Sequence, residues 1–166
     1  NSNDKNFKKE QISIYTQSGY LIDNLGTKKL NLPKTFTLEN SGGIKTVFFN
    51  DKQQYALISE SKSDCYYASI INLADAKSLF SAKCLPTDIE KIDFNGLGSS
   101  FIKFNDKIIL SLGTPTTSSA EISELAQQDN SYYGKMLVLK KENIINGILS
   151  PEIFSKGHRV PQGLTK

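Results

Sequence analysis

The chain has 166 residues, which is enough for one domain with a substantial apolar core. Twenty basic and seventeen acidic residues give a formal net charge of +3. The basic residues form no run, which argues against a nucleic-acid-binding surface. No apolar run approaches the length needed to cross a bilayer, and the polar start is not typical of a signal peptide. If the protein is exported, we expect this form to lack its leader.

Residues 1–10 are polar and charged, and we expect them to be disordered or frayed. Alternating residues at 12–15, a turn at Ser18-Gly19 and apolar residues at 20–22 predict a first hairpin. The segment 23–35 carries glycine, proline and three lysines. It indicates a connection with one short strand at most.

Two later segments resemble each other. A strand, an Asn50-Asp51 turn and a more apolar strand span residues 48–59, and the pattern recurs at residues 103–112 around Asn105-Asp106. Recurrence of a strand-turn-strand unit at a spacing of roughly 50 residues is typical of the four-stranded blades of a β-propeller. The identical core is four residues long, so chance is the competing explanation.

The two cysteines lie in a predicted hairpin between these repeats, and this hairpin would complete one blade. Residues 65–72 and 77–84 read as two strands that fold about Ala74-Asp75 and place Cys65 directly across from Cys84. Directly opposed residues on antiparallel strands are close enough for a disulfide. We therefore predict a disulfide and a periplasmic or extracellular location, with two buried thiols in a reducing compartment as the alternative.

The second half of the chain predicts one short helix inserted among strands. Ser118 and Glu121 have the spacing of a capping box, which favours a helix within a loop. A strand is expected at residues 134–141, a turn at Asn146-Gly147 and a short element at Ile153-Phe154. The fold class predicted from these elements is all-β.

No metal site is predicted. Glu121, Glu124 and Asp129 offer carboxylate oxygens, but their spacing matches no calcium-binding loop, and a solvated face is the simpler interpretation.

The terminal segment 157–164 concentrates unusual residues: the only histidine and an arginine between two glycines and a proline. Arg159 can hold a carboxylate or phosphate but cannot transfer protons near neutral pH. His158 could act as an acid, a base or a ligand. The nearest acidic side chain is Glu152, so we expect a structural role for this histidine.

The run Gly157-His158-Arg159-Val160-Pro161-Gln162-Gly163-Leu164 resembles the Gly-His-Arg-Asn-Pro-Gln-Gly-Leu signature of the soluble quinoprotein glucose and sorbosone dehydrogenases. These are six-bladed β-propellers that bind pyrroloquinoline quinone (PQQ). Residues 126–137 are similar to that family's Ala-Gln-Asp segment and Gly-Lys-Ile-Leu strand. Residues 98–113 are similar to its strand-turn-strand that opens with His-Gly-Gly and closes with Gly-Asp. Order and spacing agree over residues 95–166.

The resemblance implies a six-bladed type of propeller with four-stranded antiparallel blades, of which residues 11–166 would supply about three at about 50 residues each. We expect the native polypeptide to continue beyond Lys166. The family's catalytic histidine falls on Leu97, or on Gly96 if the register slips by one, and its aspartate falls on Thr114. Leucine transfers no proton, and threonine cannot supply the negative charge that would hold an imidazolium.

The terminal motif keeps Arg159 and Gln162, which the resemblance implies as cofactor contacts, whereas Val160 replaces the family's asparagine. A second interpretation is that the glycines and proline only shape a tight approach to an inner strand of a blade.

The sequence therefore favours an exported β-propeller binding or interaction module without dehydrogenase catalysis and without a cofactor. Its expected partners are the remaining blades or another protein, with a sugar or small anion as ligand, and the helix-bearing loop 114–133 would make contacts. Two alternatives stay open. One is an active PQQ- and calcium-dependent sugar dehydrogenase whose base comes from outside this segment. The other is a β-rich surface domain whose terminal motif is coincidental.

Overall fold

The computed structural model describes residues 12–86, 92–147 and 149–165. Strands in three antiparallel sheets dominate these residues, which confirms the all-β prediction. The frayed segment predicted at residues 1–10 lies outside the described residues. None of the described helices is long and apolar enough to span a membrane.

The first sheet is a small three-stranded one that contains the predicted N-terminal hairpin. Its strands follow in the order of the chain: β1 (Ile14–Tyr15), β2 (Tyr20–Asp23) and β3 (Gly26–Lys29). The register pairs Ile14 with Ile22 and Tyr15 with Leu21. A 3₁₀ helix, η1 (Glu39–Ser41), lies between this sheet and the next.

Each of the other two sheets contains four consecutive strands in an antiparallel meander. The first meander comprises β4 (Ile44–Asn50), β5 (Gln53–Lys62), β6 (Cys65–Asn72) and β7 (Ser78–Ser81), and the short β8 (Leu85–Pro86) also pairs with β6. The second comprises β9 (Phe101–Phe104), β10 (Lys107–Leu112), β11 (Lys135–Lys140) and β12 (Glu152–Lys156). A second 3₁₀ helix, η2 (Phe94–Leu97), precedes it.

Both repeated strand-turn-strand units are present, but the first turn is one residue later than expected. The loop residues are Asp51-Lys52 in the first unit and Asn105-Asp106 in the second. The leading residue of each loop has a left-handed backbone, with φ of 52° at Asp51 and 54° at Asn105, which Asn and Asp tolerate better than most residues. Asn50 is instead the last residue of β4, where it pairs with Gln53, and its amide Nδ2 donates to the carbonyl oxygen of Lys141 at 3.1 Å.

The predicted disulfide between Cys65 and Cys84 is present, with Cα atoms 5.4 Å apart. The two residues are not directly opposed, however, because Cys65 pairs with Pro86. Near the turn Ile71 pairs with Ser78, as predicted, but the register slips by one residue at a bulge and by one more before β8. The bridge is therefore diagonal across the ladder.

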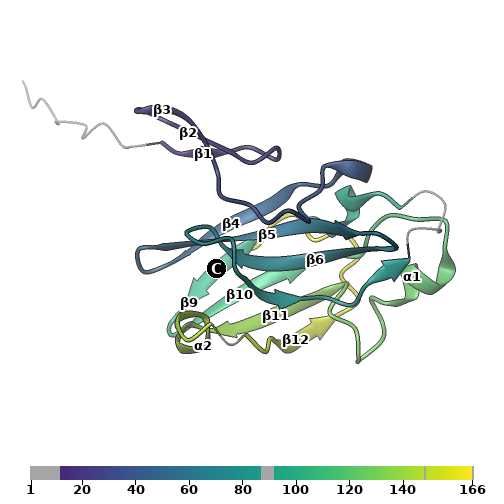
Figure 1. The fold of residues 1–166 in the computed structure, drawn as a ribbon. Helices are drawn as coiled ribbons and strands as arrows, with labels where there is room; N and C mark the ends of the chain where they lie inside the picture. The colour runs from purple at the N-terminus through teal and green to yellow at the C-terminus, as the bar shows by residue number, and fades with distance from the viewer. Residues whose placement is uncertain (1–11, 87–91, 148, 166) are drawn as a thin grey trace, which may run out of the picture.

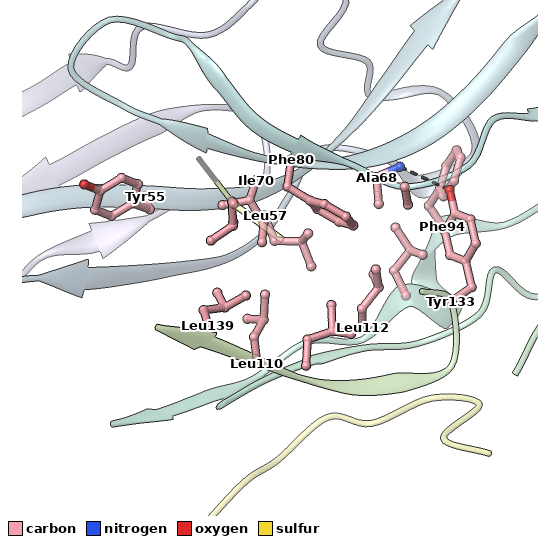
Figure 2. Packing of buried hydrophobic residues seen from close by; sticks show 14 of the residues in the cluster. Tyr55, Leu57, Ala68, Ile70, Phe80, Phe94, Leu110, Leu112, Tyr133 and Leu139 are labelled. Atoms are coloured by element: carbon pink, nitrogen blue, oxygen red, sulfur yellow. Dashed lines mark hydrogen bonds between the residues drawn. The ribbon is translucent and has the colours of Figure 1, made fainter. Parts of the chain in front are cut away.

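The main core fills the space between the two meanders, where Figure 2 shows Leu57, Ile70 and Phe80 facing Leu110 and Leu139. A smaller apolar cluster on the other face of the first meander packs against Tyr15 and Leu21 of the N-terminal sheet. The three sheets therefore form three layers, with β4–β7 in the middle (Figure 1).

The inserted helix is confirmed as α1 (Ala120–Glu124), but it is capped one residue later than expected. The hydroxyl of Ser119, not Ser118, accepts from the backbone N–H of Ile122 at 3.4 Å. A second short helix, α2 (Lys141–Ile145), follows β11 directly and was not predicted.

Candidate functional site

Three separate segments meet next to the beginning of β9. They are residues 96–100, residues 113–114 and the terminal segment 157–164, and we call their meeting place the junction. The backbone N–H of Gly113 donates to the carbonyl of Leu97 at 2.7 Å, and that of Thr114 donates to the carbonyl of Arg159 at 2.9 Å. Ser99 N–H donates to Pro161 at 3.0 Å. The junction thus brings together the terminal motif and the two positions, Leu97 and Thr114, on which the catalytic pair of the resembled family falls.

Close backbone packing at the junction explains its glycines. A Cβ atom on Gly113 would lie 2.2 Å from the carbonyl oxygen of Gly96. A Cβ atom on Gly98, whose φ is +49°, would lie 2.4 Å from the carbonyl oxygen of Pro161. Both distances are too short for any side chain, so these glycines allow the terminal segment to approach β9.

The side chains at these two positions point into the protein. Leu97 is fully buried in the main core. Thr114 is also fully buried, and its Oγ1 has no hydrogen-bond partner in the part of the chain that the structure describes. Neither side chain can take a proton from a substrate, and neither reaches solvent where a substrate could bind.

His158 is held by contacts within the fold. Its Nε2 lies 2.7 Å from the hydroxyl of Ser155, and its backbone N–H donates to the carbonyl of Gly134 at 3.0 Å. The ring is half-buried. These contacts fit the structural role expected for this histidine.

Arg159 and Gln162 lie in different surroundings. The guanidinium of Arg159 is exposed and makes no hydrogen bond or ion pair with the residues that the structure describes. Gln162 lines a cleft of about 310 Å³, which we call the junction cleft. The other residues around it are Gln17, Ile44, Lys45, Asn95, Gly98 and Ser99. The two expected cofactor contacts therefore do not line one cleft.

Lys45, at the beginning of β4, is the cation of the junction cleft. Its Nζ donates to the carbonyl of Ser41 at 2.6 Å. Burial lowers the pKa of Lys45, and the nearby Asp93 partly opposes this effect. Sequence reasoning missed Lys45 and Asn95. The available signal was the glycine-rich approach to each repeated unit, at Gly42-Gly43 before β4 and at residues 96–98 before β9.

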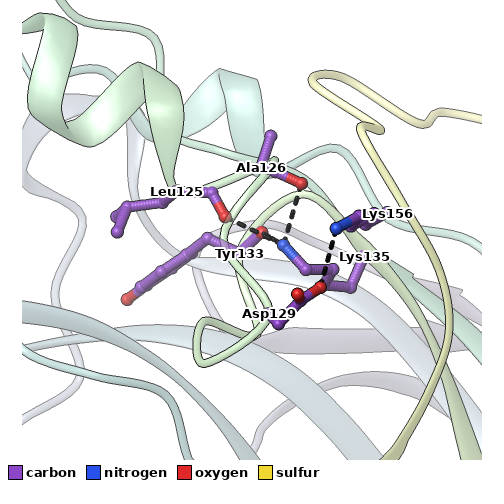
Figure 3. A network of polar contacts seen from close by, with 6 residues as sticks. All are labelled: Leu125, Ala126, Asp129, Tyr133, Lys135 and Lys156. Atoms are coloured by element: carbon purple, nitrogen blue, oxygen red, sulfur yellow. Dashed lines mark hydrogen bonds and ion pairs between the residues drawn. The ribbon is translucent and has the colours of Figure 1, made fainter.

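A second polar centre lies beside the terminal segment (Figure 3). Lys135 is fully buried, and its Nζ donates to the carbonyls of Leu125, Ala126 and Tyr133 at 2.8, 2.9 and 2.9 Å. Burial lowers the pKa of Lys135, as does the charge of Lys156, whereas Asp129 opposes the shift. Two of the three carbonyls follow α1, where backbone carbonyls have no partner within the helix. The lysine therefore fixes the end of α1 against β11.

The acidic residues near α1 do not gather around a common point. Asp129 forms an ion pair with Lys156 at 2.8 Å. Among residues 12–86, 92–147 and 149–165, no three His, Cys, Asp or Glu side chains are placed to hold a metal ion. At the positions matched to the quinoproteins, Arg159 could contact an acidic cofactor, but Leu97 and Thr114 do not fit its chemistry. The two side chains therefore offer no proton acceptor for a quinone-dependent oxidation at these positions.

No known family model, no curated protein and no solved structure matches the chain.

Proposed function

We propose that this chain is part of an exported β-propeller that serves as a binding or interaction module and resembles quinoprotein sugar dehydrogenases without sharing their catalysis. The repetition of the fold supports the propeller. Each meander follows a 3₁₀ helix, with η1 leading into β4 and η2 leading into β9. The four strands of each sheet are consecutive, as in propeller blades, whereas sandwiches typically connect their strands as Greek keys.

Exposed apolar side chains support a role in contacting a partner. Phe104 on β9 and Phe154 on β12 are 53% and 69% exposed, and they lie on the two edge strands of the second meander. Large exposed apolar side chains at both edges of a sheet fit a surface that another part or protein covers. Further blades of the same polypeptide, or a partner protein, would cover this sheet.

The disulfide supports export, because disulfides persist in oxidising compartments such as the periplasm and the extracellular space. The exposed guanidinium of Arg159 and the cation of the junction cleft, Lys45, favour a small anion or a sugar acid as ligand. A planar guanidinium with no internal partner binds a carboxylate without first breaking an existing contact.

One observation carries the non-catalytic part of the proposal: the positions that match the family's base and its orienting aspartate are a core leucine and a buried threonine. The experiment is a dye-reduction assay with pyrroloquinoline quinone, calcium and a panel of aldoses. We expect no turnover above that of the quinone alone. Turnover that disappears in Arg159→Ala and persists in the exposed control Lys156→Ala would overturn the proposal.

The second candidate function is an active PQQ-dependent sugar dehydrogenase with a base from outside this segment. It is favoured by the agreement in order and spacing over residues 95–166 and by the free guanidinium of Arg159. The same assay on the full native polypeptide separates the two functions, because turnover there, but not with this chain, would support a base supplied elsewhere. A structure of that polypeptide without blades around a common axis would instead support a β-rich domain with a coincidental motif.

A further inference from the structure

A second cleft lies on the face of the first meander that is turned away from the main core, beside the disulfide. It has a volume of about 430 Å³, within the usual range of small-ligand sites. We call it the Glu60 cleft. Its polar lining consists of Thr35, Glu60, Lys62, Tyr67, Ser78 and Ser81, and the disulfide forms part of its wall.

Glu60 is the unusual residue of this cleft. It is only 4% exposed, and its Oε2 accepts a hydrogen bond from the hydroxyl of Thr35. Its Oε1 has no hydrogen bond, and the carboxylate has no ion pair, with any residue that the structure describes. Oε1 is not fully enclosed by protein atoms, so it reaches solvent. One oxygen of a nearly buried carboxylate therefore opens into the cleft without a partner.

Burial of a carboxylate is unfavourable unless cations or several hydrogen-bond donors compensate for its lost hydration. The cation among the residues that line the cleft is Lys62, two residues along the same strand. Its Nζ lies over the ring of Tyr67, 5.5 Å from the ring centroid, and not within ion-pair distance of Glu60. The described residues thus supply one hydrogen bond, from the Thr35 hydroxyl, to a buried carboxylate that ordinarily needs several donors or a cation.

The walls of the cleft are held in place by independent contacts. The N–H of Ser61 donates to the carbonyl of Thr35 at 2.7 Å, which fixes the hydroxyl next to Glu60. On the other side, the hydroxyl of Ser81 lies 2.9 Å from that of Ser69 and 3.2 Å from that of Ser78. Because the acceptors are already ordered, a ligand would not bear the entropic cost of assembling them.

We propose that the Glu60 cleft binds a primary ammonium group, presented either by a small amine or by a lysine side chain of a partner chain. An ammonium offers three N–H donors, and its charge neutralises the buried carboxylate, which a neutral hydroxyl cannot do. Serine hydroxyls of the cleft supply further acceptors. This site is separate from the junction, and it stands whether or not the proposed propeller function holds.

The test is a titration of the ¹⁵N-labelled chain followed by NMR, with n-butylammonium chloride and acetyl-Gly-Lys-Gly-amide as probes and n-butanol as the uncharged match. We expect saturable shifts of the amides of Glu60, Tyr67 and Ser81 with both amines and none with n-butanol. Tighter binding of the peptide would identify a lysine-bearing partner as the source of the ammonium. Equal or tighter binding of n-butylammonium would identify a free amine, and either result supports the site.

Variants make the test specific. Glu60→Gln keeps the shape of the side chain and is expected to weaken amine binding at least tenfold, whereas the exposed control Glu142→Gln leaves it unchanged. Lys62→Met removes a like charge and is expected to strengthen binding or leave it unchanged. A two-dimensional spectrum of each variant establishes that it is folded, and Ser81→Ala serves as a second probe if Glu60→Gln does not fold.

Three results would overturn the proposal. The first is the absence of saturable shifts in these amides at an amine concentration 50-fold above a dissociation constant of ~1 mM, which corresponds to weak binding. The second is equal binding of n-butanol. The third is loss of binding in Lys62→Met to the same degree as in Glu60→Gln, which would make the lysine a ligand-binding donor and the ligand an acceptor.

Discussion

Replacing Lys135 with methionine would remove the ammonium that joins α1 to β11 and keep a side chain of similar length. Three carbonyls, those of Leu125, Ala126 and Tyr133, would lose their donor. A hydrogen bond to a charged group contributes about 1.5–3 kcal/mol. The gross loss is reduced because the variant no longer buries an ammonium, whose desolvation costs several kcal/mol. We expect a net loss of about 3 kcal/mol in the free energy of unfolding.

Urea denaturation followed by circular dichroism measures this loss as a lower midpoint at unchanged slope. Lys156→Met is the matched control, because it removes a lysine whose ion pair with Asp129 is on the surface, and it should cost less than about 1 kcal/mol. The reasoning is refuted if Lys135→Met is as stable as the parent chain. Such a result would mean that desolvation of the ammonium offsets all three hydrogen bonds.

The same variant has a distinct pH dependence. Burial lowers the pKa of Lys135 in the folded chain from its ordinary value of 10.5. Between the lowered value and 10.5 the unfolded chain therefore binds more protons, and this group makes stability rise with pH. The unfolding free energy of the parent minus that of Lys135→Met should therefore increase with pH across this window. A difference independent of pH would contradict the buried environment assigned to Lys135.

Further predictions concern the disulfide, Tyr133 and Thr114. Changing Cys65 and Cys84 to serine opens a loop of 19 residues and should cost about 3 kcal/mol in unfolding free energy; an unchanged urea midpoint would contradict this. Tyr133→Phe removes two hydrogen bonds to backbone groups and should cost about 2 kcal/mol. Because burial raises the pKa of Tyr133 above its ordinary 10.0, the parent should lose stability as pH rises above 10 by an amount that the phenylalanine variant lacks. Thr114→Val replaces an unpartnered buried hydroxyl with a methyl group and should raise the free energy of unfolding by about 1 kcal/mol; a lower melting temperature would show that the hydroxyl has a partner.

The strands and the disulfide were accessible from sequence because they leave local marks. Alternating apolar residues and Asn-Asp turns marked both repeated units, and two cysteines flanked one hairpin. The exact pairing was not accessible, because each slip in register depends on packing of the whole sheet. No turn residue or glycine in the sequence marks the bulge opposite Ile70 and Ile71.

Helix α2 escaped prediction for a related reason. Its N-cap is Lys140, which makes no capping hydrogen bond with its side chain, so the usual start signal is missing. Tertiary contacts hold it instead: Ile144 is buried in the main core, and Asn50 donates to the carbonyl of Lys141. Propensity is a weak guide for a five-residue helix whose stability comes from distant partners.

The candidate site was predictable in part. The resemblance to quinoproteins indicated Leu97, Thr114 and Arg159. At the junction, the backbone of Thr114 bonds to that of Arg159, and the neighbouring Gly113 bonds to Leu97. The two clefts could not be derived in this way. Lys45 reaches the junction cleft from another sheet, and Glu60 becomes unusual only because the fold buries it without a cation.

The terminal segment has a consequence for the order of folding. Its backbone hydrogen bonds join Gly157 to Ala126, His158 to Gly134 and Arg159 to Thr114, so these partners all lie in the single long connection between β10 and β11. We expect the segment to dock only after that connection is in place, because its contacts close long loops. Hydrogen exchange would detect this order: the amide of Thr114 should exchange through detachment of the terminal segment alone, whereas the amides within β10 and β11 should exchange only when the sheet itself opens.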